Sequence, residues 1–282
     1  MARRYRRDEV RARIAKVVAA GEPVVTAGAG TGLSAKCAEL GGADLVVVYN
    51  SGWFRMNGHA SIAGYLPFGN ANDIVLEMGR RQILPAVDAI PVIAGVCATD
   101  PTRDIGGLLE EIRGVGYCGV INFPTVGRID GVFRRDLESV GLGYAREAEM
   151  ITRARDADLY TLAYVFSPDD ARMMAEAGVD MLVPHVGLTA GGTIGSRDAL
   201  GLDDAAAKVQ AMIEAAWAVD PGIVTLAHGG PIATPEDVDY VLANTDAQGF
   251  VGASSMERLP VETAIIEVTR RFKAARPRRA RG

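Results

Sequence analysis

Cysteine is scarce in this sequence, and its positions are far apart. Cys37, Cys97 and Cys118 form no CxxC pair and are too few for a disulfide framework, so we expect a protein of the reducing cytoplasm. No apolar run approaches the roughly 20 residues that a membrane span requires. The arginine-rich N-terminus is not followed by the apolar segment of a secretory signal. A formal net charge of -5 argues against nucleic acid or a membrane as the partner.

Several catalytic chemistries also lack the residues that they need. No lysine lies at the end of a predicted strand, which disfavours a Schiff-base aldolase; the lysines are Lys16, Lys36, Lys208 and Lys273. HxH and HExxH motifs and clustered carboxylates are absent, so the sequence predicts no preformed zinc or two-metal site. The glycine-rich stretch 28–36 matches neither the dinucleotide fingerprint nor the phosphate-binding loop.

What the sequence does contain is a repeated unit of buried strand and helix. Eight short apolar runs rich in β-branched residues are typical of strands buried on both faces of a parallel sheet. They lie at 23–30, 44–52, 91–100, 119–127, 160–166, 181–187, 223–230 and 250–256. Ser167-Pro168 and Thr234-Pro235 are helix-start signals between them. The pattern predicts an α/β fold, a (β/α)8 TIM barrel in one domain, with an open doubly wound sheet as the alternative.

The chain divides into three expected parts. Residues 1–22 form an extra N-terminal helix, whose apolar face includes Val10 and Ile14 and covers the barrel floor or an interface. Residues 23–275 form the barrel, and 276–282 form a basic tail without fixed structure. The apolar faces of the N-terminal helix and of residues 261–272 also predict a homo-oligomer.

Histidines occur where predicted strands end. His185 ends the sixth run, His228 ends the seventh, and His59 lies in the long segment after the second. In a barrel the carboxyl ends of all strands meet at one mouth, where the chemistry of this fold takes place. Because imidazole exchanges protons near neutral pH, we predict that His185 and His228 are the catalytic acid and base. The glycines that follow, Gly229 and Gly230, would let a ligand approach the backbone.

Other polar residues follow the same rule. Asp100 is the carboxylate nearest to a strand end, and it is either catalytic or a helix N-cap. Asn122 and Tyr164 either bind substrate or close the rim of the barrel. Ser254 and Ser255, after the last strand, either bind an anion or form a tight turn.

Two segments are too long for ordinary strand-to-helix connections. Residues 51–70, rich in glycine and aromatics, follow the second strand, and residues 187–201 follow the sixth. We expect both to act as lids that exclude water from the mouth.

The stretch GAGTGLSAKCAELGGADLVVVYNSGW at 28–53 resembles the opening of the isocitrate lyase and phosphoenolpyruvate mutase superfamily of barrels. In that superfamily a Ser-Gly turn after the second strand holds the carboxylate and ketone of a 2-oxo acid. The resemblance therefore implies that Tyr49, Ser51, Gly52 and Trp53 bind substrate. We also assign Tyr49 a catalytic role, with Asn122, towards the oxygen on which negative charge develops.

The chain as a whole resembles the phosphoenolpyruvate hydrolase-like barrel family. The stretches that carry this resemblance are VYNSGWFRMNGHASIAGYLPFGNAN, NFPTVGRIDGVFR, HVGLTAGGTIG, HGGPIATPEDV and GASSMERLP. They extend from the first strand to the last helix. A barrel of the same kind also forms part of a plant protein that blocks the replication of tobamovirus RNA, so the resemblance alone does not establish catalysis.

Two departures from the superfamily concern its metal and its base. The metal-binding DxD expected after PVIA is replaced by Gly95 and Cys97, and the lysine/cysteine lid motif is missing. The sequence therefore assigns no metal ligand and leaves Mg²⁺ open. The resemblance implies a hydrolase or lyase acting on a small phosphorylated or carboxylated 2-oxo acid, or on its enol form, as in phosphoenolpyruvate or phosphonopyruvate. The alternatives are a carbon–carbon lyase or aldolase on a 2-oxo acid and a binding barrel without catalysis.

Overall fold

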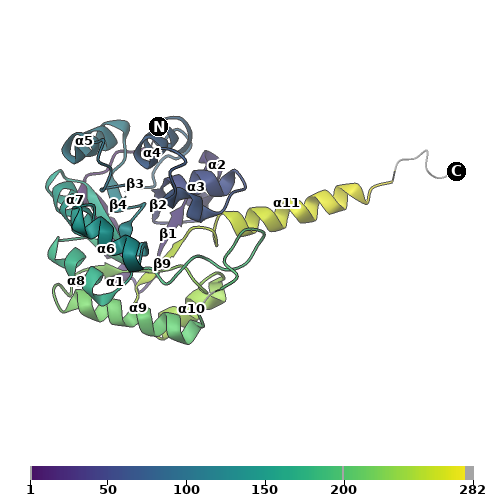
Figure 1. The fold of residues 1–282 in the computed structure, drawn as a ribbon. Helices are drawn as coiled ribbons and strands as arrows, with labels where there is room; N and C mark the ends of the chain where they lie inside the picture. Colours follow the sequence, from purple (N-terminus) through teal and green to yellow (C-terminus); the bar gives the residue numbers. More distant parts are fainter. Residues whose placement is uncertain (1, 199, 277–282) are drawn as a thin grey trace.

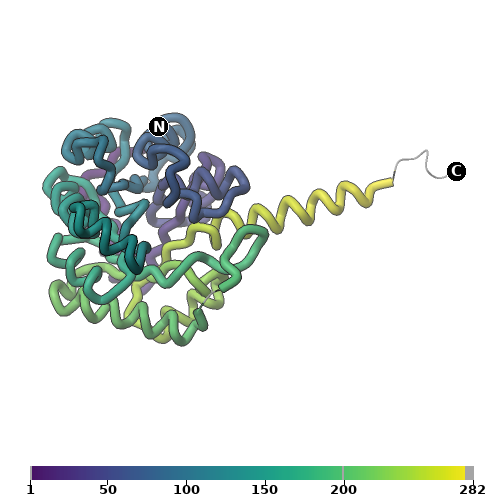
Figure 2. Tube along the Cα trace, viewed as in Figure 1, coloured from purple at the N-terminus to yellow at the C-terminus, as the bar shows by residue number. Residues whose placement is uncertain are grey.

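The computed structural model describes residues 2–198 and 200–276, and its centre is a cylinder of parallel strands ringed by helices (Figures 1 and 2). In sequence order the strands are β1 (Val24–Gly28), β2 (Leu45–Val48), β3 (Val92–Val96), β4 (Gly119–Asn122), β5 (Tyr160–Val165), β6 (Met181–Pro184), β7 (Val224–Thr225), β8 (Ala227–His228) and β9 (Gly249–Gly252). The sheet order is β7-β6-β5-β4-β3-β2-β1-β9-β8.

The sheet closes because β7 and β8 are two halves of one stretch, separated by Leu226. The Leu226 N–H donates to the Leu182 carbonyl at 2.9 Å, and the Val186 N–H donates to the His228 carbonyl at 3.0 Å. The stretch therefore pairs with β6 on one side and with β9 on the other. The predicted TIM barrel is confirmed.

Both faces of the strands are buried, which explains their continuous apolar runs. On β2, Leu45 and Val47 join the cluster inside the barrel, whereas Val46 and Val48 join the cluster beneath the helices. Successive side chains of a strand point to opposite faces, so a strand buried on both faces requires apolar residues at every position.

Helices cover the outside of the cylinder. They are α2 (Gly32–Leu40), α4 (Ala71–Met78) with its continuation η2 (Gly79–Ile83), α5 (Ile105–Val115), α6 (Gly131–Ser139), α7 (Ala145–Asp156), α8 (Pro168–Glu176), α9 (Leu202–Trp217) and α10 (Pro235–Ala243). Ser167 caps α8 by accepting a hydrogen bond from the Asp170 N–H, and Thr234 caps α10 in the same way from Asp237. Both predicted start signals are confirmed.

The N-terminal helix α1 (Arg7–Ala19) lies against the amino ends of the strands. Val10 and Ile14 are buried in the same cluster as Val24 and the other residues inside the barrel. Arg7 donates two hydrogen bonds to Asp180, which immediately precedes β6, at 2.9 and 2.7 Å. The helix therefore covers the barrel floor.

The chain after β2 differs from the prediction. Residues 49–52 are not strand: Tyr49 is the N-cap of α3 (Asn50–Met56), and a short helix, η1 (Ser61–Tyr65), follows. Within α3 only glycine fits at residue 52, because a Cβ there would lie 2.9 Å from the Gly30 Cα. The segment 51–70 is thus largely helical, and it folds back over the mouth. Near the sequence NFPTVGR after β4, a further short helix, η3, spans Val126–Arg128.

The last helix, α11 (Arg258–Lys273), projects away from the barrel (Figures 1 and 2). Along it, large apolar side chains are exposed, namely Val261, Ile265, Ile266, Val268 and Phe272. Beyond residue 276, the predicted basic tail lies outside the described residues. No helix in the described part of the chain combines the length and apolarity that crossing a bilayer demands. The cytoplasmic location stays a prediction.

Candidate active site

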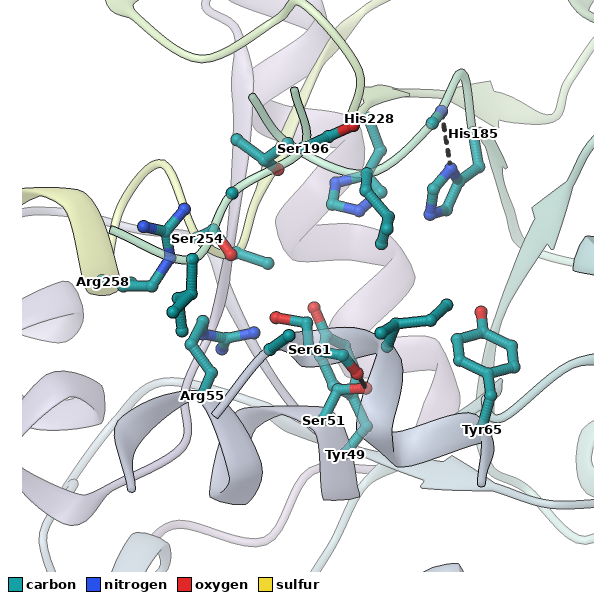
Figure 3. A pocket seen from close by; sticks show the side chains of 18 of the residues that line it. Tyr49, Ser51, Arg55, Ser61, Tyr65, His185, Ser196, His228, Ser254 and Arg258 are labelled. Atoms are coloured by element: carbon teal, nitrogen blue, oxygen red, sulfur yellow. Dashed lines mark hydrogen bonds between the residues drawn. The ribbon is translucent and has the colours of Figure 1, made fainter. Parts of the chain in front are cut away.

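A cavity of about 70 Å³ opens at the carboxyl ends of the strands (Figure 3). Strand ends, the α3–η1 segment, the 187–196 loop and the start of α11 all contribute to it. The polar and aromatic residues that line it are Tyr49, Ser51, Arg55, Ser61, Tyr65, Phe123, Tyr164, His185, Thr189, Ser196, His228, Ser254 and Arg258. The predicted mouth therefore gathers side chains from residue 49 to residue 258 around one small volume.

Two histidines face each other in this cavity, with ring centroids 4.7 Å apart. The Nδ1 atom of His185 accepts a hydrogen bond from the Gly187 N–H at 3.1 Å, so its proton resides on Nε2. The Nδ1 atom of His228 lies 2.6 Å from the Val251 carbonyl, which can only accept, so Nδ1 carries the proton and Nε2 is free. The pair thus offers one N–H donor and one basic nitrogen.

Both imidazoles are held neutral. Burial, with smaller contributions from the positive charges of Arg55 and Arg128, lowers the pKa of His228 to about 4, although the hydrogen bond to the Val251 carbonyl raises it. Burial also lowers the pKa of His185 well below its ordinary value, with His228 and Arg128 contributing. At neutral pH the donor and the base are therefore both ready without any change of protonation.

Two of the three tyrosines that line the cavity have hydroxyls without a partner in the described part of the chain. The hydroxyl groups of Tyr164 and Tyr65 are buried and have no hydrogen-bond partner among the described residues. Burial of an unpaired hydroxyl is unfavourable, and such groups are retained where a ligand or water completes them. Because both residues line the cavity, their hydroxyls mark it as a site built for a polar ligand.

Tyr49 lies between two glycines on the strands that flank β2. A Cβ at Gly95 on β3 would be 2.6 Å from the Tyr49 Cβ, and a Cβ at Gly28 on β1 would be 2.7 Å from the Tyr49 hydroxyl oxygen. The ring of Tyr49 also packs on Phe123 with a centroid distance of 4.6 Å. Neither glycine therefore has room for a side chain while Tyr49 occupies this position.

Arg55 brings a buried positive charge to the cavity wall. Its guanidinium pairs with Glu257 through Nε, at 2.8 Å, and through Nη2. Glu257 also accepts from the Gly30 N–H at 2.6 Å and from the Ser34 hydroxyl. Arg55 lines the cavity and Glu257 does not, so the guanidinium lies between the carboxylate and the ligand space. These contacts use Nε and Nη2 and leave Nη1 for a ligand.

Arg258, at the start of α11, is the second buried cation of the wall. Its Nη1 contacts both carboxylate oxygens of Glu262, at 3.1 and 3.0 Å, and its Nη2 donates to the Gly191 carbonyl at 3.0 Å. Glu262 in turn accepts from the Thr193 N–H at 3.1 Å. The loop that follows β6 is therefore attached to the first turns of α11. Figure 3 shows Arg55, Arg258 and Ser254 on one side of the cavity, with His185 and Tyr65 on the other.

The family of the chain follows from comparison with known proteins. The model of the phosphoenolpyruvate hydrolase-like family matches residues 9–275. The chain belongs to this family. Two relatives from Solanum lycopersicum, the ToMV susceptible protein tm-1(GCR26) and the ToMV resistance protein Tm-1(GCR237), are each 52% identical over 258 residues, or 91% of this chain. The match covers 34% of each relative, so the chain spans about a third of their length.

Solved structures share the fold at low sequence identity. Phosphonopyruvate hydrolase, determined with oxalate and Mg²⁺, aligns with a TM-score of 0.59 and 17% identity, covering 94% of this chain and 87% of that one. Oxaloacetate acetylhydrolase with its product oxalate aligns with a TM-score of 0.56 and 16% identity, covering 96% and 89%. At these identities the likeness establishes the barrel fold, as predicted from the sequence.

In this member of the phosphoenolpyruvate hydrolase-like family, six of the predicted site residues line the cavity. They are Tyr49, Ser51, Tyr164, His185, His228 and Ser254. The Ser51 hydroxyl donates its hydrogen to the Ser61 carbonyl at 2.7 Å, so its oxygen could only accept a hydrogen bond from a ligand. The predicted roles of all six stay predictions.

Two predicted polar residues lie outside the cavity with their hydrogen bonds completed. Asn122 donates to Glu147, at 2.7 Å, and to the Tyr164 carbonyl, and accepts from the Tyr164 N–H. Asp100 accepts from Thr102 and from two asparagines on and before α4, at 2.6 to 3.0 Å. Burial would raise the pKa of Asp100, but these hydrogen bonds outweigh it and lower the pKa to about 2.

The remaining predicted residues do not line the cavity either. Gly52 packs on Gly30, Trp53 is 37% exposed, and Ser255 is half-buried beyond the wall. A Cβ at Gly229 would be 2.2 Å from the Gly187 carbonyl oxygen, and the Gly230 N–H donates to that same carbonyl at 2.8 Å. The two glycines thus leave room for the close approach of the Gly187 backbone. His59, expected at the same rim, is exposed after α3.

Sequence reasoning did not identify Arg55, Arg258, Tyr65 or Ser196 as site residues. The arginines lie one helical turn or less beyond the quoted strand ends YNSG and GASS, within the stretches that carry the family resemblance. An arginine within an otherwise apolar or glycine-rich stretch directly after a strand was the available signal for both. Glu147 was also missed: burial raises its pKa to about 7, against hydrogen bonds from Thr125, Val126 and Asn122 that lower it.

The Mg²⁺ left open by the sequence does not fit the residues of this cavity. Mg²⁺ requires hard oxygen ligands and is usually bound through one or two carboxylates. The described lining supplies two guanidinium groups and two neutral imidazoles, together with hydroxyls and aromatic rings. Among the described residues, no group of three or more histidine, cysteine, aspartate or glutamate side chains is arranged to hold a metal ion.

Proposed function

We propose that this chain is a hydrolase or lyase that cleaves a small 2-oxo acid bearing a second anionic group, with phosphonopyruvate and oxaloacetate as reference substrates and phosphoenolpyruvate as the enol counterpart. The observation that carries the proposal is the pair of neutral histidines, one presenting an N–H and the other a free nitrogen, opposite two buried guanidiniums. Charge anchors and proton-transfer groups thus surround a cavity of small-molecule size.

The anionic groups of the substrate bind on the arginine side. Arg55, through its free Nη1, and Arg258 face the cavity together with the Ser254 hydroxyl, and hydrogen bonds from a charged guanidinium to carboxylate or phosphonate are stronger than those between neutral groups. This assignment moves the carboxylate anchor from the predicted Ser51 and Gly52 to the two arginines. The 2-oxo group then lies nearer to the histidines and to the unpartnered hydroxyl of Tyr164.

Hydrolysis in this geometry uses each histidine in its observed tautomer. The free Nε2 of His228 takes a proton from water, whose oxygen attacks the phosphorus of phosphonopyruvate or adds to the C2 carbonyl carbon of oxaloacetate. The bond from that atom to the methylene carbon breaks, and its electron pair forms the enolate. The Nε2–H of His185 and the Tyr164 hydroxyl donate hydrogen bonds to the oxygen of the 2-oxo group, which carries the negative charge of the pyruvate enolate or of the tetrahedral adduct of oxaloacetate. The protonated His228 then returns its proton to the methylene carbon.

The two solved neighbours support this substrate class by analogy of fold. One is a phosphonopyruvate hydrolase and the other an oxaloacetate acetylhydrolase, and both were determined with oxalate. Both named substrates are 2-oxo acids with a second anionic group. The two arginines of this chain supply matching positive charge.

Two other functions compete with hydrolysis. Carbon–carbon cleavage or condensation without water uses the same anchors, and it yields two carbon fragments and no inorganic phosphate. A binding barrel without catalysis is the second alternative, in keeping with the named tomato relatives. The opposite tautomers of the histidine pair favour an enzyme, because a binding site does not need a free base beside a donor.

The test is product analysis by NMR after incubation of the purified chain with phosphonopyruvate, oxaloacetate and phosphoenolpyruvate. We expect turnover of at least one of them. The His228→Asn variant should lose about 10²–10⁴-fold in kcat, the range of general acid–base catalysis, at an unchanged melting temperature. Wild-type inertness towards the whole panel contradicts the proposal, as does full turnover by the folded variant.

We also propose that the chain forms a homo-oligomer through α11. Its exposed apolar side chains, including Ile265 and Phe272, exceed the scattered apolar surface of a typical monomer. A largely apolar groove of about 480 Å³ lies between α2 and the base of α11 and includes Leu33 and Pro260. A second copy supplies apolar surface of matching chemistry. Light scattering during size-exclusion chromatography should show an oligomer that Ile265→Glu with Phe272→Glu dissociates; a monomeric wild type contradicts this.

A further inference from the structure

The two positions where the superfamily resemblance places metal-binding carboxylates are unsuited to metal in this chain. At Gly95, an added Cβ would lie 2.6 Å from the Tyr49 Cβ and 3.1 Å from the Phe123 carbonyl oxygen. An aspartate therefore has no room there, because real Cβ atoms do not approach other heavy atoms this closely. Cys97 supplies a thiol whose pKa is raised by burial, so it remains uncharged. The space at this corner of the mouth belongs to the side chain of Tyr49.

The carboxylates nearest to the mouth are already engaged. Asp100 accepts four hydrogen bonds, with Oδ1 facing Thr102 and Oδ2 facing the asparagines of the α4 region. Glu147 accepts from Asn122, Thr125 and the Val126 N–H, each at 2.7 Å. Their oxygens would have to leave these buried partners before they could bind a cation, and buried polar groups left without partners are costly.

Glu257 is also unavailable, and its arrangement places positive charge towards the cavity. It holds Arg55 from behind while accepting from Gly30 and Ser34, so both of its oxygens are occupied. Arg55 and Tyr49 both lie in the wall of the cavity. A divalent cation entering this space would meet a guanidinium held in place by a buried ion pair.

We infer that the site binds its dianionic ligand without a divalent cation, because Tyr49 fills the metal position and Arg55 with Arg258 supplies the charge that a metal would supply. The dianionic ligand rests on the proposed function. The inference goes beyond that function, because it gives the electrophilic role to Arg55 and Arg258, for which the family resemblance implies no role. It also departs from the phosphonopyruvate hydrolase structure, which contains Mg²⁺.

The inference is tested by calorimetric titration of oxalate into the purified chain, once with EDTA and once with excess MgCl2. Oxalate is a suitable probe because it is a compact dianion found in both solved neighbours. We expect dissociation constants that agree within about twofold when both are expressed on free oxalate, after allowance for the magnesium–oxalate complex. Titration of MgCl2 into the free and the oxalate-saturated chain, corrected for complex formation without protein, should show no saturable binding.

Matched variants assign the charge. Arg55→Gln combined with Glu257→Gln removes the buried pair without leaving an unpaired carboxylate, and it should weaken oxalate binding at least tenfold with EDTA present. The control is Arg172→Gln, which alters an arginine exposed on α8, and its oxalate affinity should equal that of the wild type.

The possible failures are distinguishable. Oxalate binding that appears only with Mg²⁺, or saturable Mg²⁺ binding at one site, overturns the inference and leaves the proposed function intact. Unchanged oxalate affinity in a folded double variant also overturns it, because Arg55 would then supply no charge to the ligand. Absence of oxalate binding in both buffers contradicts the proposed function, and the inference falls with it.

Discussion

The two ends of the barrel are built from the same parallel strands, yet they differ in every physical respect. At the amino end, α1 places Val10 and Ile14 against Val24 inside the cylinder, and Arg7 with Asp180 joins helix to strand. At the carboxyl end, rings and charges surround a cavity of about 70 Å³, and the hydroxyl of Tyr164 has no partner among the described residues.

The difference shows how one scaffold separates stability from function. At the floor Val10 and Ile14 are packed in the inner cluster and Arg7 is paired with Asp180, so changes there should act on the free energy of unfolding. At the mouth several polar groups are held ready for something outside the chain, so changes there should act on binding. Buried ion pairs and imidazoles at the mouth should affect both stability and binding, so variants of these groups test how far the separation holds.

The largest expected effect comes from the mouth. Glu257→Ala leaves Arg55 buried without its counter-charge, so the free energy of unfolding should fall by about 3–5 kcal/mol. Urea denaturation measures this effect. The control Glu149→Ala removes an exposed pair with Arg153 and should cost less than about 1 kcal/mol. Equal effects for the two variants would show that the Arg55–Glu257 pair is accessible to water.

A change at the floor should be nearly as large but leave binding untouched. Ile14→Ala opens a cavity in the inner cluster and should lower the free energy of unfolding by about 2–5 kcal/mol. The exposed Val140→Ala at the end of α6 is the control, with an expected change within about 0.5 kcal/mol. Calorimetry at a temperature where the variant is folded should give the wild-type oxalate affinity; weaker binding would show that the two ends are coupled.

The histidine pair makes stability depend on pH. The pKa of His228 is about 4 in the folded chain and about 6.5 when unfolded. Below pH 6.5 the unfolded state binds the extra proton, so this contribution to stability is lost as the pH falls towards 4. Between pH 7 and pH 5 the loss should be about 1–2 kcal/mol. His228→Gln should remove it in urea denaturation; an unchanged slope would contradict the burial of this imidazole.

Glu147 acts in the opposite sense. Its folded pKa of about 7 lies above the ordinary value, so its contribution is present below pH 4.5 and is lost as the pH rises through 7. Glu147→Gln should therefore flatten the stability profile between about pH 4.5 and pH 7, and the same denaturation series at pH 5 and pH 7 measures this.

The smallest expected effect on stability comes from removing a single hydroxyl oxygen at the mouth. Tyr164→Phe removes an unpartnered hydroxyl, so the free energy of unfolding should stay within about 1 kcal/mol or rise, while oxalate binding weakens. Tyr144→Phe is the matched control: its hydroxyl donates to the Tyr164 carbonyl at 2.6 Å, so its loss should destabilise by about 1 kcal/mol without the same loss of affinity. The reverse pattern would place the ligand elsewhere.

The fold could be predicted because burial on both faces leaves a strong pattern. The runs around β2 and β5 are apolar at successive positions, and this identified strands, their order of succession and the mouth where His185 and His228 meet. The helical course of α3 could not be predicted in the same way. Its glycine and aromatic residues resemble a loop, and Gly52 is needed for a close approach to Gly30 that is distant in sequence.

The site was only partly predictable because local sequence does not show which strand-end residues face the ligand. Asn122 ends β4 as expected, but its amide is used between β4 and β5, towards Glu147 and the Tyr164 backbone. Conversely, Arg55 owes its place in the wall to Glu257, a partner 202 residues along the chain. Such pairings form only when the barrel closes, so no short stretch of the sequence reveals them.

The position of Tyr49 between Gly28 and Gly95 has an evolutionary consequence. A carboxylate at residue 95 collides with the tyrosine, whereas a smaller residue at 49 first leaves an unfilled hollow between three strands. Either substitution made alone should thus destabilise the mouth, so the order in which the two occur matters. Conversion between this mouth and one with the metal-binding DxD at residues 95 and 97 therefore has to pass through a destabilised intermediate. Each lineage should keep its own form of the mouth for long periods.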